Sequence, residues 1–98
     1  MRVRFFAHIR KITGCAEADI PYKENIGALA RLLCDRYGDK LRQIIFPDGI
    51  PDGNGKEEKF GPEIIFLING RHVSHLGGTA APLENDDRVD VFPVVAGG

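Results

Sequence analysis

The residues with the clearest chemical potential lie at the carboxyl end of the sequence, which reads Pro-Val-Val-Ala-Gly-Gly over positions 93–98. Glycine loses more conformational entropy than any other residue when it is fixed, so Gly97 and Gly98 are poor choices for a packed element. An unbranched, extended tail can instead enter a narrow channel and present its carboxylate to the active site of another protein. Pro93 cannot donate a ladder hydrogen bond, so we expect it to end the last strand and residues 94–98 to project as a flexible tail.

Other residue types that often carry chemistry form no catalytic or metal-binding constellation in this sequence. Cys15 and Cys34 are too few for a disulfide framework and lack the spacing of metal ligands. His72 and His75 form a His-x-x-His pair, but on a strand this spacing places the two rings on opposite faces. We therefore expect neither a metal nor a bound cofactor on this chain.

Hydrophobic patterns predict the elements that carry the tail. Strands are predicted from alternation, from an unbroken apolar run or from a position after a turn, at residues 2–9, 16–20, 64–68, 71–74 and 88–92. Asn69-Gly70 is a strong hairpin signal between the third and fourth of these strands. Apolar residues at helical spacing follow Asn25, a suitable N-cap, and stop before Gly38, which predicts one main helix. A further short helical turn is expected around residues 41–45.

This order of elements favours an α+β fold, with one main helix packed on one face of a mixed sheet of about four to five strands. The first and last strands are expected to lie side by side at the centre of the sheet. The folded domain is predicted to span residues 1–93. Residues 47–62, the segment richest in Gly and Pro, are expected to form an exposed, mobile loop within it.

Three phenylalanines are predicted to form an exposed aromatic patch. Phe6 and Phe92 fall on the outward side of the first and last strands, so pairing of these strands would make them neighbours. Phe66 is expected to join them from the middle strand. Such a patch on a small protein commonly marks a surface for a partner. The alternative is that the helix covers this face, because a shift of one residue reverses the side on which every residue of a strand points.

Composition excludes several classes of function. The chain of 98 residues has a formal net charge of −1, which gives no bulk electrostatic drive toward nucleic acid or an anionic membrane. Its longest apolar run, residues 64–68, is far shorter than the roughly 20 residues that a membrane-spanning helix needs. The start of the sequence lacks the apolar stretch of a signal peptide, so we expect a cytoplasmic protein.

The tail and the order of strands together resemble the small sulfur-carrier subunit of molybdopterin synthase, a family of ubiquitin-like β-grasp proteins. The resemblance covers nearly the whole chain. Its most specific segments are the two ends: Val3-Arg4-Phe5-Phe6-Ala7, Arg10-Lys11-Ile12-Thr13-Gly14, Leu83, Asp86-Asp87, Val89 and residues 92–98. The helix up to Arg36-Tyr37-Gly38 and the hairpin around Asn69-Gly70 agree with the family, although other small β-grasp domains share these features.

The resemblance implies a carrier rather than a self-sufficient catalyst. An E1-like adenylating enzyme would activate the Gly98 carboxylate with ATP, and a sulfur donor protein would then convert it to a thiocarboxylate, with Gly97 giving steric access. The large subunit of molybdopterin synthase would receive the tail. We expect Phe6, Phe66 and Phe92 to bind these partners, together with three residues at the start of the tail: Pro93, Val95 and Ala96.

Several other functions remain open from the sequence. Relatives that supply sulfur for thiamine, cysteine or tRNA thiolation share the same pattern, and a tungsten cofactor would be served in the same way as a molybdenum cofactor. A ubiquitin-like modifier would use the same activated tail to form an isopeptide bond with lysine. A third class is a β-grasp interaction domain that has an idle tail.

Overall fold

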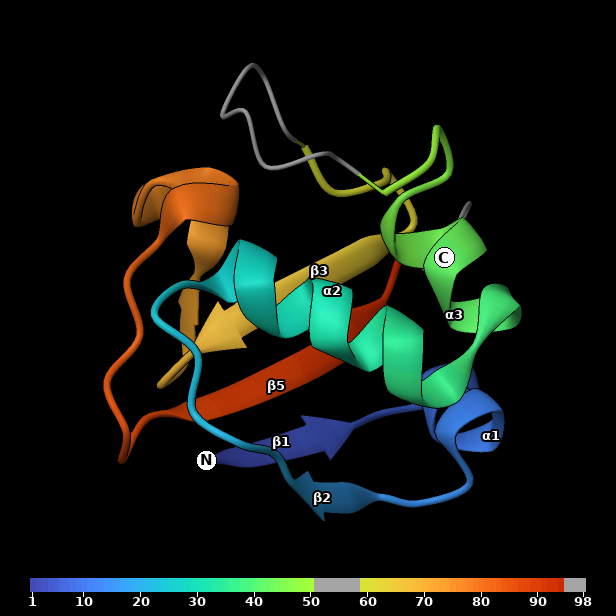
Figure 1. The fold of residues 1–98 in the computed structure, drawn as a ribbon, viewed down its shortest axis with the longest axis horizontal. Helices are drawn as coiled ribbons and strands as arrows, with labels where there is room; N and C mark the ends of the chain where they lie inside the picture. The colour runs from blue at the N-terminus through green and yellow to red at the C-terminus, as the bar shows by residue number, and fades with distance from the viewer. Residues whose placement is uncertain (51–58, 95–98) are drawn as a thin grey trace.

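The computed structural model describes residues 1–50 and 59–94, which form one mixed sheet crossed by a helix (Figure 1). In chain order the elements are β1 (Arg2–Phe5), α1 (His8–Thr13), β2 (Glu17–Asp19), α2 (Ile26–Tyr37), α3 (Asp39–Ile45), β3 (Ile64–Ile68), β4 (Arg71–His72), the 3-10 helices η1 (Val73–His75) and η2 (Gly78–Ala80), and β5 (Arg88–Pro93).

The five strands are arranged in the order β2-β1-β5-β3-β4, with β5 in the middle. β1 and β5 run parallel, and the register pairs Val3 with Val89 and Phe5 with Val91. All other neighbouring strands are antiparallel. The first and last strands therefore lie side by side as predicted, and the predicted α+β class with a mixed sheet is confirmed.

The main helix begins and ends where the sequence predicts. The Asn25 side chain accepts a hydrogen bond from the backbone N–H of Ala28 at 2.8 Å, which satisfies a donor that the first turn leaves unpaired. Gly38 ends the helix at a φ of +89°, a backbone conformation that favours glycine. α2 crosses one face of the sheet (Figure 1). Its apolar stripe is buried against the strands, through Ile26, Leu29, Ala30, Leu33 and Cys34.

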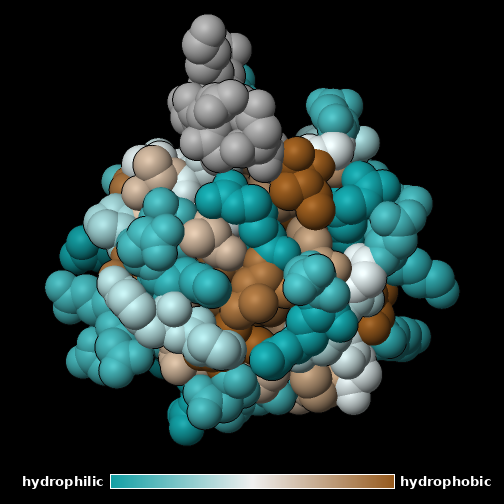
Figure 2. Space-filling view, viewed as in Figure 1, coloured by the Kyte–Doolittle hydropathy of each residue, from teal (hydrophilic) through white to brown (hydrophobic). Residues whose placement is uncertain are grey.

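We use the term outer face for the side of the sheet opposite α2. Alternation along β1 and β5 sends Val3, Phe5, Val89 and Val91 into the core, where all four are fully buried. The intervening residues of the same two strands point to the outer face. Figure 2 shows the side that carries α2, where hydrophilic residues surround smaller apolar areas.

The prediction of a strand over residues 2–9 is only half correct. β1 ends at Phe5, and α1 follows it before the chain returns as β2. Ala7 makes the turn with a φ of +52°, which is unusual for a residue other than glycine. Ile9 is fully buried, but as part of a helix rather than a strand. The return strand predicted at 71–74 is similarly shortened to Arg71–His72, because η1 takes over at Val73.

The loop predicted at residues 47–62 is packed at its far end. The Phe60 ring lies 4.5 Å from that of Phe66 and 5.7 Å from that of Phe46, measured between centroids. Gly61 is buried, and its N–H donates to the Ile45 carbonyl at 2.8 Å. The expected exposure holds for residues 47–50 and fails at Phe60 and Gly61, and residues 51–58 lie outside the described part of the chain.

Within residues 1–50 and 59–94, no helix combines the length and the apolar character required to span a lipid bilayer.

Candidate functional site

The candidate site lies where β5 leaves the sheet. Pro93 is the last residue of β5 and pairs with Ile64 of β3. One more hydrogen bond follows it, from the Val94 N–H to the Glu63 carbonyl at 2.9 Å. Val94 is 41% exposed, which makes it one of the few large apolar side chains open to solvent among the described residues. The predicted site residues Val95, Ala96, Gly97 and Gly98 lie outside the described part of the chain.

Phe6 and Phe92 lie next to this exit and stack on each other. Their ring centroids are 4.2 Å apart and their planes differ by only 7°. The backbone fixes this arrangement, because the Phe6 N–H donates to the Val91 carbonyl at 3.1 Å and so continues the β1–β5 pairing by one residue. Both rings are half-buried. The prediction that these two residues are neighbours is confirmed.

The expected exposure of Phe66 is wrong. Phe66 is 1% exposed and pairs with Val91, so it points into the core beneath the helices. Ile65, which is half-buried and pairs with Phe92, takes the outward position instead. Every residue of the run 64–68 is apolar, so the sequence gives no alternation that assigns its faces, and the register with β5 decides them. We call Phe6, Ile65 and Phe92 the aromatic surface.

A partly buried ion pair borders the aromatic surface on the outer face. The Arg4 guanidinium donates to both oxygens of Asp90, from Nε to Oδ1 at 2.7 Å and from Nη2 to Oδ2 at 2.9 Å. The Arg88 guanidinium lies 3.6 Å from the same carboxylate. The Arg4 guanidinium carbon also sits 5.4 Å from the centroid of the Phe6 ring, within the range of a cation–π contact. Arg4 therefore links the ion pair to the aromatic stack.

Electrostatics in this cluster favour the charged forms. Asp90 is only 3% exposed, and burial alone would raise its pKa. The hydrogen bonds from Arg4 outweigh this penalty and hold the pKa of Asp90 below its ordinary value. The same hydrogen bonds raise the pKa of Arg4. The carboxylate thus stays ionised at neutral pH, and the site presents one fixed pattern of charge beside the rings.

The outward position of Ile65 and the burial of Asp90 were not predicted. The ion pair of Asp90 has a signal in the sequence, because Arg4 and Asp90 alternate in step with Phe6 and Phe92, which were predicted on the outward side of strands expected to pair, so that opposite charges can meet there. No pattern in the sequence indicates that the carboxylate is buried.

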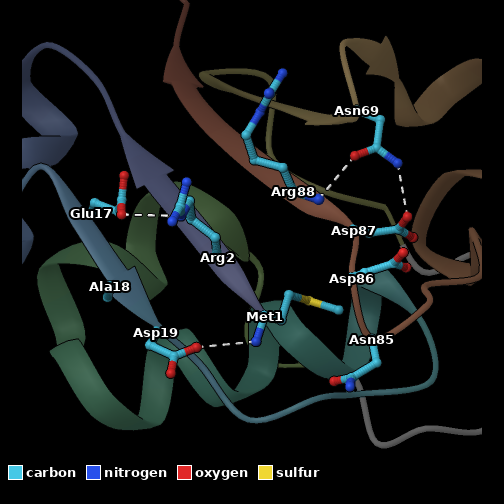
Figure 3. Close-up of a pocket in the computed structure, with 10 residues that line it drawn as sticks. All are labelled: Met1, Arg2, Glu17, Ala18, Asp19, Asn69, Asn85, Asp86, Asp87 and Arg88. Atoms are coloured by element: carbon cyan, nitrogen blue, oxygen red, sulfur yellow. Dashed lines mark hydrogen bonds and ion pairs between the residues drawn. The ribbon is translucent and has the colours of Figure 1, made fainter.

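A polar hollow lies at the opposite end of β1 and β5 (Figure 3). It has a volume of about 650 Å³, and most charges that line it already have partners. The amine of Met1 lies 3.1 Å from Asp19, and Arg2 lies 3.1 Å from Glu17. The Asn69 side chain links the turn after β3 to the start of β5. Its amide N–H donates to Asp87 at 2.8 Å, and its amide oxygen accepts from the Arg88 N–H at 2.9 Å. These contacts hold the strand ends together.

Metal binding finds no support in the described part of the chain, where no three His, Cys, Asp or Glu side chains are grouped to hold an ion. The end of β5 offers instead a surface for binding, made of the aromatic surface and the flanking arginine–aspartate cluster, immediately before the tail.

Comparison with known proteins gives a consistent result over the full length. The model of the ThiS family matches residues 3–98. Small archaeal modifier protein 3 of Haloferax volcanii is 34% identical over 100% of this chain and 98% of its own length. The solution structure of small archaeal modifier protein 1 from Methanosarcina acetivorans is 30% identical, with a TM-score of 0.78 over 99% of this chain and 94% of that chain.

A more distant solved structure shares the fold. It is a Pyrococcus furiosus protein assigned as subunit 1 of the molybdopterin converting factor, which is 24% identical and has a TM-score of 0.61 over 96% of this chain and 95% of that chain. The structural similarities confirm the predicted ubiquitin-like β-grasp architecture. With a family match that covers nearly every residue, this chain belongs to the ThiS family of ubiquitin-like sulfur carriers and modifiers.

Proposed function

We propose that this chain is a carrier protein whose Gly98 carboxylate is activated by a separate enzyme and loaded with sulfur. The observation that supports the proposal is the path of β5. This central strand passes the stacked Phe6 and Phe92 rings and reaches an exposed Val94 only four residues before Gly98. A partner that docks on the aromatic surface would therefore have the tail within reach of its active site.

The chemistry explains why activation is needed. A carboxylate is a poor electrophile at neutral pH, whereas an acyl adenylate formed with ATP carries a good leaving group. An E1-like adenylating enzyme would form this adenylate and release pyrophosphate. The terminal sulfur of a persulfide on a donor protein would then attack the acyl carbon and expel AMP. This attack forms a new C–S bond and leaves the S–S bond of the donor intact. Attack of a thiol on the sulfur of the donor cysteine would then break that S–S bond, release the thiocarboxylate on Gly98 and leave a disulfide between the thiol and the donor cysteine.

The role assigned to this chain in that cycle is binding and presentation. ATP would be bound by the activating partner, and this chain would hold no cofactor. Gly97 and Gly98 lack side chains, so they would admit the tail to a narrow channel. Pro93 would restrict the backbone at the point where the tail begins, because its ring fixes φ. Val95 and Ala96 would add small apolar contacts. The cycle is assigned to the cytoplasm.

For the acceptor, we favour the pterin precursor of the molybdenum or tungsten cofactor. In this assignment the chain is the small subunit of molybdopterin synthase, and its tail enters the large subunit. The support is the resemblance of the two ends of the sequence, residues 3–14 and 83–98, to those carriers. Each transfer regenerates the carboxylate, so two loaded carriers are required for one dithiolene.

A second candidate function is that of a protein modifier. It is favoured by the 34% identity over the full chain to a small archaeal modifier protein. The same acyl adenylate would then be passed to the amine of a lysine, which forms an isopeptide bond. Both functions require the same activation, and they diverge at the nucleophile that attacks the acyl adenylate, which is a persulfide for a carrier and a lysine amine for a modifier.

The test is the intact mass of the protein purified from its native host, compared with a variant that lacks Gly97 and Gly98. A carrier will show a fraction whose mass is raised by the replacement of one oxygen with sulfur, and the truncated variant will not. A modifier will show additional bands on a denaturing gel that react with an antibody to this chain. If neither change appears in cells that contain the activating enzyme, the proposal is wrong and an interaction domain with an idle tail is left.

A further inference from the structure

A smaller hollow, separate from the polar hollow and from the aromatic surface, lies between β3, the two 3-10 helices and the segment that enters β3. Its volume is about 220 Å³, smaller than the roughly 300–1,000 Å³ of sites that take drug-sized ligands. Phe60, Phe66 and Ile64 make its apolar floor. Phe66 and Ile64 have the register parity of the helix-bearing side of β3, so this hollow and the aromatic surface lie on opposite faces of the sheet.

Hydrogen-bond donors surround the mouth of this hollow. Lys59 and Ser74 are exposed and His72 is half-buried. The Nδ1 atom of His72 accepts a hydrogen bond from the Ser74 N–H at 3.0 Å. The register pairs His72 with the outward Leu67, so its ring is not among the donors of this hollow. Lys59 offers a positive charge, and Ser74 offers a hydroxyl.

Acidic side chains are missing from this rim: none of the described residues that line the hollow is Asp or Glu. The polar hollow at the other end of the sheet contrasts with it, because Glu17 and Asp19 there neutralise Arg2 and the Met1 amine. An apolar floor bordered by donors, with no acidic residue among the described lining, suits a ligand that combines an apolar body with one negative charge. Burial of the body against Phe60 would supply most of the affinity, and the rim would orient the charge.

We propose that this hollow binds a small monocarboxylate with an aromatic or branched apolar body. The body would pack against the half-buried Phe60, and the carboxylate would accept hydrogen bonds from Lys59 and Ser74. The volume limits the ligand to about ten non-hydrogen atoms, for which a dissociation constant of about 1 mM is expected. The inference does not depend on the chemistry of the tail.

The experiment is a titration of the full-length, isotope-labelled protein followed by amide NMR. Phenylacetate is the probe, and phenylacetamide is the matched neutral ligand with the same number of heavy atoms. Saturable shifts are expected at the amides of Gly61, Val73, Ser74 and Gly78, which line or border the hollow. Phenylacetamide should bind about two- to fivefold more weakly, the range that an exposed charge contributes.

Two variants separate the rim from the bulk charge of the protein. Lys59→Gln should weaken phenylacetate binding by about two- to fivefold and leave phenylacetamide unaffected. Lys23→Gln removes a lysine outside the hollow and should change neither. The spectrum itself shows whether each variant folds. The proposal is overturned if no saturable shift appears up to about 20 mM ligand, if the shifts map to the aromatic surface, or if the two probes bind equally.

Discussion

At the scale of single residues, the outer face carries a buried carboxylate, that of Asp90, which the register places between Arg4 and Leu67. Asp90 lies under Arg4 and Arg88 and is held by two short hydrogen bonds from Arg4. If one partner of a buried hydrogen bond is removed, the partner that remains is left unsatisfied and the folded state loses free energy. The pair is therefore expected to matter for stability as well as for the position of the Phe6 ring that Arg4 covers.

The first prediction concerns this ion pair. Asp90→Asn should lower the free energy of unfolding by about 1–3 kcal/mol, because it leaves the Arg4 charge without a counter-ion. The matched control is Asp39→Asn, which removes a carboxylate that also bonds an arginine, Arg42, at 2.8 Å but whose side chain is 73% exposed. The control should cost clearly less than Asp90→Asn, because an exposed ion pair contributes little to stability. Urea unfolding followed by circular dichroism measures both, and equal losses would contradict the prediction.

The pH dependence of that loss can be predicted from the direction of the shift. The pKa of Asp90 is lower in the folded state than the value of about 3.9 expected when unfolded, so its contribution to stability is complete above about pH 5. The contribution is lost as the pH falls through the folded-state pKa. The difference between wild type and Asp90→Asn should hence be constant from pH 7 to about 5 and shrink below about pH 4. A difference that stays constant to about pH 2 would exclude the assignment.

The second prediction separates the aromatic surface from the core. Phe92→Ser should abolish co-elution with the activating enzyme, yet change the free energy of unfolding by less than about 2 kcal/mol, because the ring is only half-buried. Phe66→Ala is the comparison, since this ring is 1% exposed, and it should cost about 3–5 kcal/mol. Unchanged co-elution of Phe92→Ser would remove this residue from the binding surface.

At the scale of elements, the junction between β1 and α1 sets the position of Phe6. Ala7 turns the chain with a φ of +52° and a ψ of −134°, a conformation that a side chain disfavours. The two elements on either side are nevertheless fixed, because the Phe6 N–H donates to the Val91 carbonyl and Ile9 is fully buried. The strain at Ala7 is therefore imposed by the packing of its neighbours.

The third prediction tests this strain. Ala7→Gly should raise the free energy of unfolding by about 1 kcal/mol, because relief of the strained backbone exceeds the additional flexibility of the unfolded chain. Ala28→Gly, an identical change within the regular backbone of α2, should lower it by about 1 kcal/mol. The opposite signs make the pair a stringent comparison by thermal unfolding. A loss of stability in both variants would show that Ala7 is not strained.

At the scale of the whole molecule, the sheet separates two surfaces. The aromatic surface and the end of β5 lie on its outer face, whereas the small hollow lies on the side that carries α2. The central strand β5 lies between the two surfaces. Occupation of one surface should leave the other free.

The fourth prediction follows from this separation. Saturation with phenylacetate should change the dissociation constant of the activating enzyme by less than about twofold. If phenylacetate and the activating enzyme exclude each other, then either the hollow contributes to the enzyme interface or ligand binding alters the sheet. Calorimetry with and without the small ligand measures the effect, and acetate at equal ionic strength is the control for salt.

Local signals in the sequence were sufficient for much of the fold. α2 begins after Asn25 and ends before Gly38, as expected. The positive φ of Asn69 and Gly70 follows directly from the turn type that their sequence favours. Alternation in β5 placed Val89 and Val91 in the core. The Gly-Gly end supplied the functional hypothesis, since its argument depends on the absence of side chains and needs no packing.

Tertiary structure alone decided which residues of β3 face the core, whether α1 is a helix, and that Asp90 is buried against Arg4. An uninterrupted apolar strand has no internal phase, so only the register of β3 with β5 could bury Phe66 and turn Ile65 outward. The same holds for α1, where a single buried isoleucine fits a strand or a helix equally well until its neighbours are placed. The ion pair between Arg4 and Asp90 joins residues 86 positions apart, a distance across which only the fold can bring them together.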